Sequence, residues 1–318
     1  MGIASYLREI GRGKESARSL SQAQSADLMG QLLDGRLSDL EIGAFALAMR
    51  IKGETVAELA GFLGAVESRC LVIQSDRPTV VLPSYNGARK LPNLTPLLAL
   101  LLAQEGVQVL VHGPRSDPAR VTSADIFHDL GLSSANDASD IEQAWSRREP
   151  VFVRTEALCP PLARLLDVRR IVGLRNSGHI VAKLLDPVRG GVSLRVVNYT
   201  HPEYLQLLGQ FMQHTGADAM LMRGTEGEPV ADPRRNPRLD VYLAGQARSD
   251  LSRPAQVGAL TDLPLLPQQI DAATTALYIQ AVVSGEKPTP VPIARQVDAL
   301  LRTLVARTTP GQRIALPR

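Results

Sequence analysis

The chain has 318 residues, of which 44% are hydrophobic and 21% are charged, and its formal net charge is +3. This balance is typical of a folded globular protein and excludes a disordered chain. The longest apolar run, residues 94–103, reaches about half of the roughly 20 residues that a membrane-spanning helix needs. Cys70 and Cys159 lack the spacing of a zinc site or a disulfide framework, and the N-terminus lacks a secretory segment. We therefore expect a cytoplasmic protein with one large and one small domain.

The first seventy residues indicate helices only. Ser21 and Gln24 form one capping-box pattern and Ser38 and Glu41 form another, in which each pair satisfies backbone N–H groups at a helix start. The first helix should end near residues 34–35 and the second near 52–53. A third helix is expected from about residue 54 to 69.

After residue 78 the pattern changes to strands that alternate with helices. The strand-like runs are residues 80–82, 107–111, 151–153, 195–199 and 219–222. Such alternation predicts a largely parallel sheet with crossover helices. Residues 160–186 interrupt this order with helix-like sequence and no strand.

Positive charge is concentrated in one stretch of the chain. Between residues 164 and 195 the only acidic residues are Asp167 and Asp186. The basic residues of this stretch are Arg164, Arg169, Arg170, Arg175, Lys183, Arg189 and Arg195. The excess is consistent with an anion-facing surface or with a solvated helix face.

Several short motifs occur in a fixed order along the chain. They are RIKGE (50–54), PSYNGARK (83–90), NLTPLLA (93–99), CPPL (159–162), GLRNSGH (173–179) and RGTEGE (223–228). With these motifs the chain resembles the anthranilate phosphoribosyltransferase family over nearly its whole length. It resembles still more closely the YbiB family, whose members share this glycosyltransferase family 3, nucleoside phosphorylase-like fold. That family is described as dimeric and nucleic-acid-binding, without the transferase reaction.

The resemblance implies an α/β fold with a small N-terminal helical domain and a larger α/β domain around a mainly parallel central sheet. It places residues 1–75 in the helical domain, together with a returning helical segment at about 160–186. Residues 76–159 and 187–318 then form the α/β domain. It also implies a homodimer that associates through the helical domain.

Compared residue by residue, the chain departs from the transferase motifs. The glycine-rich diphosphate loop of the enzymes corresponds to residues 83–87, where Pro83, Tyr85 and Asn86 replace glycines. Proline removes an N–H donor, and the other two side chains obstruct close approach of a diphosphate. Of the acidic pair that binds metal in the enzymes, Gly227 and Glu228 hold the matched positions. One carboxylate leaves Mg²⁺ with few ligands, so we expect no metal, no cofactor and no catalytic residue.

Other positions of the enzyme site keep polar groups, and Glu226 and Glu228 are expected to be surface charges left from the metal site. The candidate residual anion site comprises Ser84, Asn86, Gly87, Thr95, His112, Gly113 and Arg115. Tyr85 either packs in the loop or stacks on a base.

The resemblance implies a cleft between the two domains. Lined by cations and without the carboxylates of the enzyme site, such a cleft suits the phosphate backbone of a nucleic acid. The candidate nucleic-acid-binding residues are Arg89, Lys90, Arg175, Lys183, Arg169, Arg170, Arg12, Lys14 and Lys52. Aromatic residues are few and no helix-turn-helix or zinc-finger pattern is present, so weak sequence preference is expected on DNA or RNA. Two alternatives remain: a phosphoribosyltransferase with an altered substrate, and an inactive binder of small anions or nucleotides.

Overall fold

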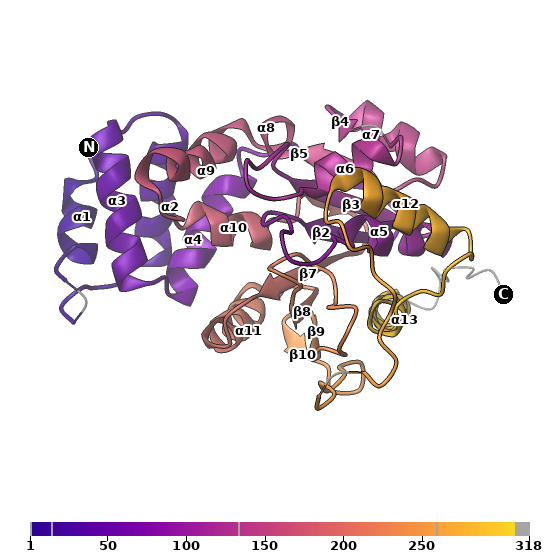
Figure 1. Cartoon of the computed structure of the whole chain (residues 1–318). Coiled ribbons are helices and arrows are strands. Elements are labelled where there is room, and N and C mark those ends of the chain that lie inside the picture. Colours follow the sequence, from indigo (N-terminus) through magenta and orange to yellow (C-terminus); the bar gives the residue numbers. More distant parts are fainter. Residues whose placement is uncertain (1, 14, 133, 259, 309–318) are drawn as a thin grey trace. The chain divides into compact units, whose positions relative to one another are not determined.

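Figure 1 shows a computed structural model of the chain, which describes residues 2–13, 15–132, 134–258 and 260–308. The chain forms two compact units, and each is built from two segments. The helical unit comprises the chain up to residue 71 and residues 158–187, and the sheet unit comprises residues 72–157 and those from 188 onward. The sequence placed these divisions after residues 75, 159 and 186.

The helical unit consists of helices contributed by both of its segments. They are α1 (Ala4–Ile10), α2 (Gln22–Leu33), α3 (Asp39–Lys52), α4 (Val56–Glu67), α9 (Pro160–Val172) and α10 (Gly178–Leu184). Both predicted capping boxes are present: Ser21 with Gln24 begins α2, and Ser38 with Glu41 begins α3. A third box, Thr55 with Glu58, begins α4.

The core of the helical unit depends on close helix packing. A Cβ atom on Gly61 of α4 would lie 2.3 Å from the carbonyl oxygen of Gln22, so α2 and α4 meet where no side chain fits. Phe45 of α3 packs edge-on against Phe62 of α4, with ring centroids 5.8 Å apart. Phe45 and Met49, which recur at helical spacing, are therefore core residues.

Within its described residues, the sheet unit contains one large sheet of eight strands and one small sheet of two. In chain order the strands are β1 (Ile73–Ser75), β2 (Thr79–Pro83), β3 (Gln108–Gly113), β4 (Ser134–Ala135), β5 (Val151–Arg154), β6 (Val188–Gly190), β7 (Ser193–Tyr199), β8 (Ala219–Arg223), β9 (Leu239–Leu243) and β10 (Gln246–Ala247). The large sheet has the order β10-β9-β8-β7-β2-β3-β5-β4; the β8–β9 and β9–β10 pairs are antiparallel, and the other neighbours pair in parallel. Strands β1 and β6 pair in parallel as a separate sheet. The predicted fold class is confirmed.

Helices cover the large sheet and enclose its core (Figure 1). They are α5 (Thr95–Gln104), α6 (Ser123–Asp129), α7 (Ala138–Ser146), α11 (Glu203–Thr215), α12 (Ala272–Val283) and α13 (Val291–Arg307). The short helix α8 (Thr155–Leu158) lies where the chain passes from the sheet unit to the helical unit. Alternate strand residues such as Val80 and Leu82 face the same core as Leu97 of α5 and Leu300 of α13. β2 thus lies inside the sheet, between β7 and β3, and its carboxyl end presents the loop that follows.

Candidate functional site

The loop of residues 83–91 follows β2 at the carboxyl edge of the parallel strands, where α/β proteins bind ligands. Pro83 is the last residue of β2, and the N–H group of Ser84 donates to the carbonyl oxygen of His112 at 2.8 Å. This bond continues the β2–β3 ladder into the loop. Gly113 of β3 cannot carry a Cβ atom, which would lie 1.9 Å from the carbonyl oxygen of Ser84.

The carboxylate of Glu228 lies inside this loop. Its Oε1 atom accepts hydrogen bonds from the backbone N–H groups of Asn86 and Gly87, both at 2.7 Å. Its Oε2 atom accepts from the hydroxyl of Ser84 and, at 3.3 Å, from that of Thr95. The residue is only 1% exposed. Backbone and hydroxyl donors of this kind are what a buried anion requires.

Glu226 binds the second half of the same loop. Its Oε1 atom accepts from the N–H groups of Lys90 at 2.8 Å and Leu91 at 2.9 Å, with Arg89 farther away at 3.4 Å. Arg120 lies 3.9 Å from the other oxygen. A single turn, residues 225–228, therefore supplies two carboxylates to the N–H groups of the loop.

The expectation that both glutamates are surface charges is wrong for Glu228, which is buried and bonded throughout. The carboxylate was missed because it approaches the loop from a turn about 140 residues later. The sequence signal available was the pair of glutamates on either side of Gly227, in a turn after a strand. Glycine there permits the backbone φ of +88°.

The structure brings most of the candidate anion site together. Ser84, Asn86, Gly87 and Thr95 surround Glu228. His112 and Gly113 lie on the neighbouring strand β3, whereas Arg115 is exposed.

Tyr85 packs rather than presenting its ring to solvent. It is 7% exposed, and its hydroxyl lies 2.9 Å from Nδ1 of His112. The two rings meet edge-on with centroids 5.4 Å apart. Of the two roles considered for Tyr85, the structure shows the packing role.

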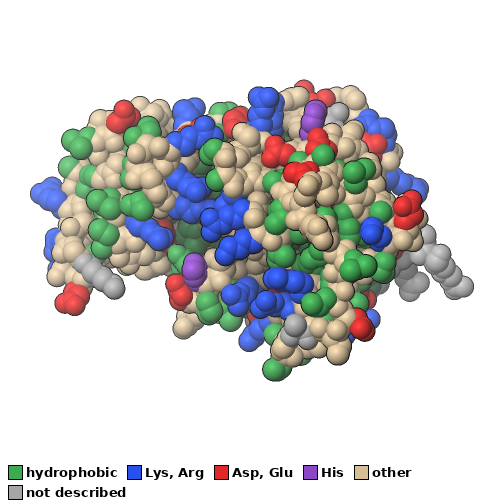
Figure 2. All heavy atoms as spheres, in the orientation of Figure 1, with side chains coloured by type: hydrophobic (Ala, Val, Ile, Leu, Met, Phe, Trp, Pro, Cys, Tyr) green, Lys and Arg blue, Asp and Glu red, His purple; other side chains and the backbone are tan. Residues whose placement is uncertain are grey.

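A cluster of cations surrounds His179 in the helical unit. Burial, and then the positive charges of Arg175, Arg169 and Lys183, lower the pKa of His179 to about 3. Three of the candidate nucleic-acid-binding residues thus lie close enough to one another to act on one imidazole. Figure 2 shows Lys and Arg side chains gathered near α10 on the face drawn. We call Arg169, Arg175 and Lys183 the basic cluster.

The remaining candidate cations have different surroundings. Arg89 and Lys90 are exposed, and Arg170 is exposed with an ion pair to Asp167 at 3.1 Å. Arg12 pairs with Glu9 at 2.7 Å, and Lys14 lies outside the described residues.

Lys52 is engaged inside the helical unit. Its side chain is only 7% exposed, and its ammonium group lies 2.7 Å from Glu58 and 2.8 Å from the carbonyl oxygen of Gly53. Glu58 is itself buried and accepts from the N–H groups of Leu20 and Thr55. The structure therefore gives Lys52 a role in the core of the helical unit rather than on its surface.

No group of three or more His, Cys, Asp or Glu side chains within the described ranges is arranged to hold a metal ion. Within the same part of the chain, no helix combines the length and apolar character needed to cross a membrane.

Comparison with known proteins agrees with this architecture. Residues 4–70 match the helical bundle domain of the glycosyl transferase family, and residues 87–241 match its α/β domain. The fold also matches the crystal structure of anthranilate phosphoribosyltransferase from Thermus thermophilus, with a TM-score of 0.68 at 20% identity over 98% of this chain and 90% of that one.

Among curated proteins, the chain is 26% identical to anthranilate phosphoribosyltransferase of Methanopyrus kandleri, over 89% of this chain and 84% of that protein. It is 38% identical over 304 residues to the uncharacterized protein YbiB of Escherichia coli, covering 95% of this chain and 94% of YbiB. The chain therefore belongs to the glycosyl transferase family with a helical bundle and an α/β domain, and within it to the relatives of YbiB.

Proposed function

We propose that this protein is a homodimer that binds nucleic acid with little sequence preference, on a phosphoribosyltransferase-like fold that no longer binds a diphosphate and Mg²⁺. The observation that carries the proposal is the basic cluster near His179: Arg169 lies on α9, Lys183 on α10, and Arg175 between these two helices. Cations spaced along a surface neutralise backbone phosphates and release counterions, without reading bases.

The loop supports the loss of the transferase reaction. A diphosphate would need the N–H groups of Asn86, Gly87, Lys90 and Leu91, which already bind the carboxylates of Glu226 and Glu228. Two carboxylates in that position also repel a second anion.

The residues present do not fit the metal either. Mg²⁺ requires carboxylate oxygens that face the ion. Both oxygens of Glu228 instead accept hydrogen bonds from the loop and from hydroxyl groups, and Gly227 brings no carboxylate. The geometry thus favours a binding protein over a phosphoribosyltransferase with an altered substrate.

The exposed apolar face of α3 supports the proposed homodimer. Leu40, Leu47 and Ile51 are 84%, 48% and 53% exposed, and they recur along one side of the helix. This side is distinct from the buried side that holds Phe45 and Met49. A second copy of the chain, presenting the same apolar side, would cover it symmetrically.

The proposal is tested by titrating labelled single-stranded DNA, duplex DNA and RNA at several salt concentrations. Replacing Arg175 or Lys183 with alanine should reduce the slope of log affinity against log salt by about 0.9 for duplex DNA, because one phosphate contact is lost. The loss should be similar for unrelated sequences. Arg302→Ala is the matched control, because Arg302 is an exposed arginine of α13 in the sheet unit and pairs with Asp298.

Each outcome has a clear meaning. Unchanged slopes in both variants would exclude the basic cluster as the binding surface. Binding of phosphoribosyl diphosphate that requires Mg²⁺ would instead favour the enzyme, and binding of small anions without nucleic-acid binding would favour the inactive small-anion binder.

A further inference from the structure

The two cysteines lie where the chain leaves and re-enters the helical unit. The first segment of that unit ends at Leu71 and the second begins at Leu158. The N–H group of Leu71 donates to the carbonyl oxygen of Leu158 at 2.7 Å, so the two connections are bonded to each other. Cys70 and Cys159 are the neighbours of this bonded pair.

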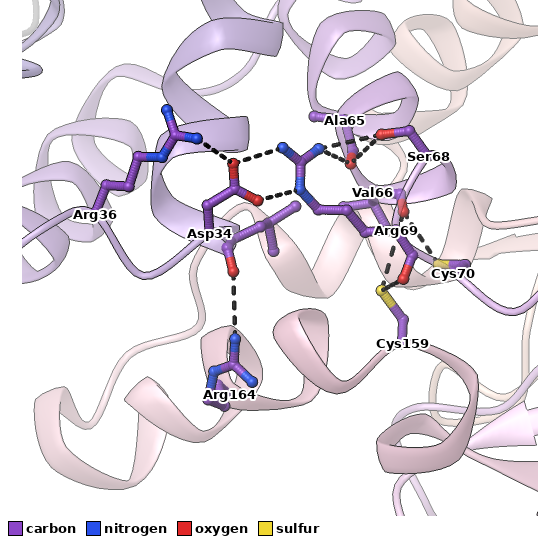
Figure 3. Close-up of polar contacts among 10 residues, drawn as sticks. Asp34, Arg36, Ala65, Val66, Ser68, Arg69, Cys70, Cys159 and Arg164 are labelled. Carbon is purple, nitrogen blue, oxygen red and sulfur yellow. Dashed lines mark hydrogen bonds and ion pairs between the residues drawn. The ribbon is translucent and has the colours of Figure 1, made fainter. Parts of the chain in front are cut away.

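The two sulfur atoms share a hydrogen-bond acceptor. The Cys70 thiol donates to the carbonyl oxygen of Val66 at 3.2 Å, and the Sγ atom of Cys159 lies 3.9 Å from the same oxygen. The Cys159 sulfur also lies 3.7 Å from the carbonyl oxygen of Arg69. Figure 3 shows the two side chains converging on this carbonyl from the end of α4 and the start of α9. Both are free thiols.

The surroundings stabilise a thiolate at Cys159. A hydrogen bond from Cys70 and one from the N–H group of Leu162, with the positive charges of Arg69 and Arg164, lower the pKa of Cys159, although burial acts in the opposite direction. Arg69 is held in place by a two-pronged ion pair with Asp34, at 2.7 and 3.0 Å (Figure 3). Thiolates of low pKa are the nucleophiles of thiol chemistry.

We propose that Cys70 and Cys159 are a redox pair that hydrogen peroxide oxidises to an intramolecular disulfide. Cys159 is fully buried, whereas Cys70 is partly exposed and is the sulfur that an oxidant reaches. The Cys70 sulfur attacks peroxide, the O–O bond breaks, and the thiol proton passes to the departing hydroxide, so Cys70 becomes a sulfenic acid as water is released. The Cys159 sulfur then attacks the Cys70 sulfur, the S–O bond breaks, and the proton of the Cys159 thiol joins the departing hydroxide, so the disulfide forms with release of a second water. Two thiols and one peroxide thus give one disulfide and two waters.

The bridge would fasten the two connections of the helical unit to each other. The Leu71–Leu158 hydrogen bond already joins them, and the disulfide would make that junction covalent. A partly exposed disulfide is accessible to reducing thiols, so the bridge is reversible.

The test uses the reduced full-length protein and hydrogen peroxide, followed by alkylation of remaining thiols and mass measurement of the intact chain. The wild type should lose both alkylatable thiols and about 2 Da, which corresponds to two hydrogens, without forming covalent dimers. Dithiothreitol should restore both thiols. Addition of one or more oxygen atoms to the wild type, or a covalent dimer in place of the internal bridge, would overturn the proposal.

Single variants assign the two roles. In Cys159→Ser the Cys70 sulfenic acid has no partner, so oxygen should accumulate on Cys70. In Cys70→Ser the buried Cys159 should react at least tenfold more slowly than the wild type. Equal rates in Cys70→Ser and the wild type would contradict the assignment.

A second measurement does not depend on these variants folding well. The oxidised wild type should unfold at a higher urea concentration than the reduced wild type, because a cross-link between residues 70 and 159 restricts the unfolded chain. Cys159→Ala, treated with peroxide in the same way, should show no such rise. If the intact mass shows the disulfide but the wild type does not unfold at a higher urea concentration, the disulfide does not stabilise the junction between the two connections.

Discussion

Glu226 combines an unusual backbone conformation with a carboxylate that binds the loop after β2. Its φ is +53°, in the left-handed region that costs a residue with a side chain about 1–2 kcal/mol. The conformation aims its carboxylate at the N–H groups of Lys90 and Leu91. Such strain at a non-glycine residue persists when the surrounding contacts hold it in place.

Replacing Glu226 with glycine should recreate a small anion site. Glycine adopts the same φ without strain, and the N–H groups of Lys90 and Leu91 lose their partner beside Arg120. Inorganic phosphate at ten times its Kd should then stabilise the variant by about 1.4 kcal/mol, measured as a shift in thermal unfolding. Glu226→Gln is the matched control, because its amide oxygen can keep the loop bonds. An equal response of the wild type to phosphate would contradict this reading of the loop.

His179 gives the stability of the protein a dependence on pH. Its pKa falls from 6.5 to about 3 on folding, so the unfolded chain binds the proton more readily. The contribution is fully present above pH 6.5 and is lost as the pH falls toward 3, with a slope of at most about 1.4 kcal/mol per pH unit. His179→Gln should flatten the urea-unfolding free energy between pH 6.5 and 4. An equal decline in the variant would show that other groups are responsible.

At the scale of elements, the connection between α3 and α4 depends on one buried ion pair. Lys52, the last residue of α3, neutralises Glu58, which caps the start of α4 and bonds to Leu20. The two helices are therefore joined by charge as well as by the packing of Phe45 on Phe62.

Lys52→Ala should destabilise the helical unit without weakening nucleic-acid binding directly. Glu58 would remain buried without its cation, which costs roughly 3 kcal/mol. Arg50→Ala, at an exposed position on the same helix, should change stability by no more than about 0.5 kcal/mol. A lower salt slope for Lys52→Ala with unaltered unfolding would instead assign Lys52 to the binding surface.

Local patterns were sufficient to predict the central strands of the large sheet and the helices from α2 to α4. The capping boxes at Ser21 and Ser38 begin helices, and the five apolar runs are β2, β3, β5, β7 and β8. Strands β4 and β10 have two residues each, too few for a periodic pattern.

The site could be predicted only in part, since its contacts join distant segments. The resemblance to the transferase motifs implied that Pro83, Tyr85 and Asn86 stand where the enzymes have glycines. Spacing in the sequence contained no information that Glu228 would fill the loop, or that Glu58, beyond the turn after α3, would bind Lys52.

At the scale of the whole molecule, the exposed side of α3 determines the expected assembly. Leu47→Glu should place a charge at the centre of the proposed dimer contact and yield monomers in sedimentation equilibrium, at concentrations where the wild type is dimeric. Leu277→Glu, at a 67% exposed position on α12, should leave the dimer intact. A monomeric wild type, or equal dissociation in both variants, would contradict the proposed dimer contact.

The distance along the chain between the loop and its turn has a consequence for synthesis. Asn86 and Glu226 are 140 residues apart, and Gly87 and Glu228 are 141 apart. While the chain is still emerging from the ribosome, only water can bind the N–H groups of the loop until the turn at 225–228 has left the exit tunnel. Closing such a long segment costs chain entropy before any contact forms. The carboxylates can therefore bind the carboxyl edge of the sheet only after residues 225–228 have been synthesised.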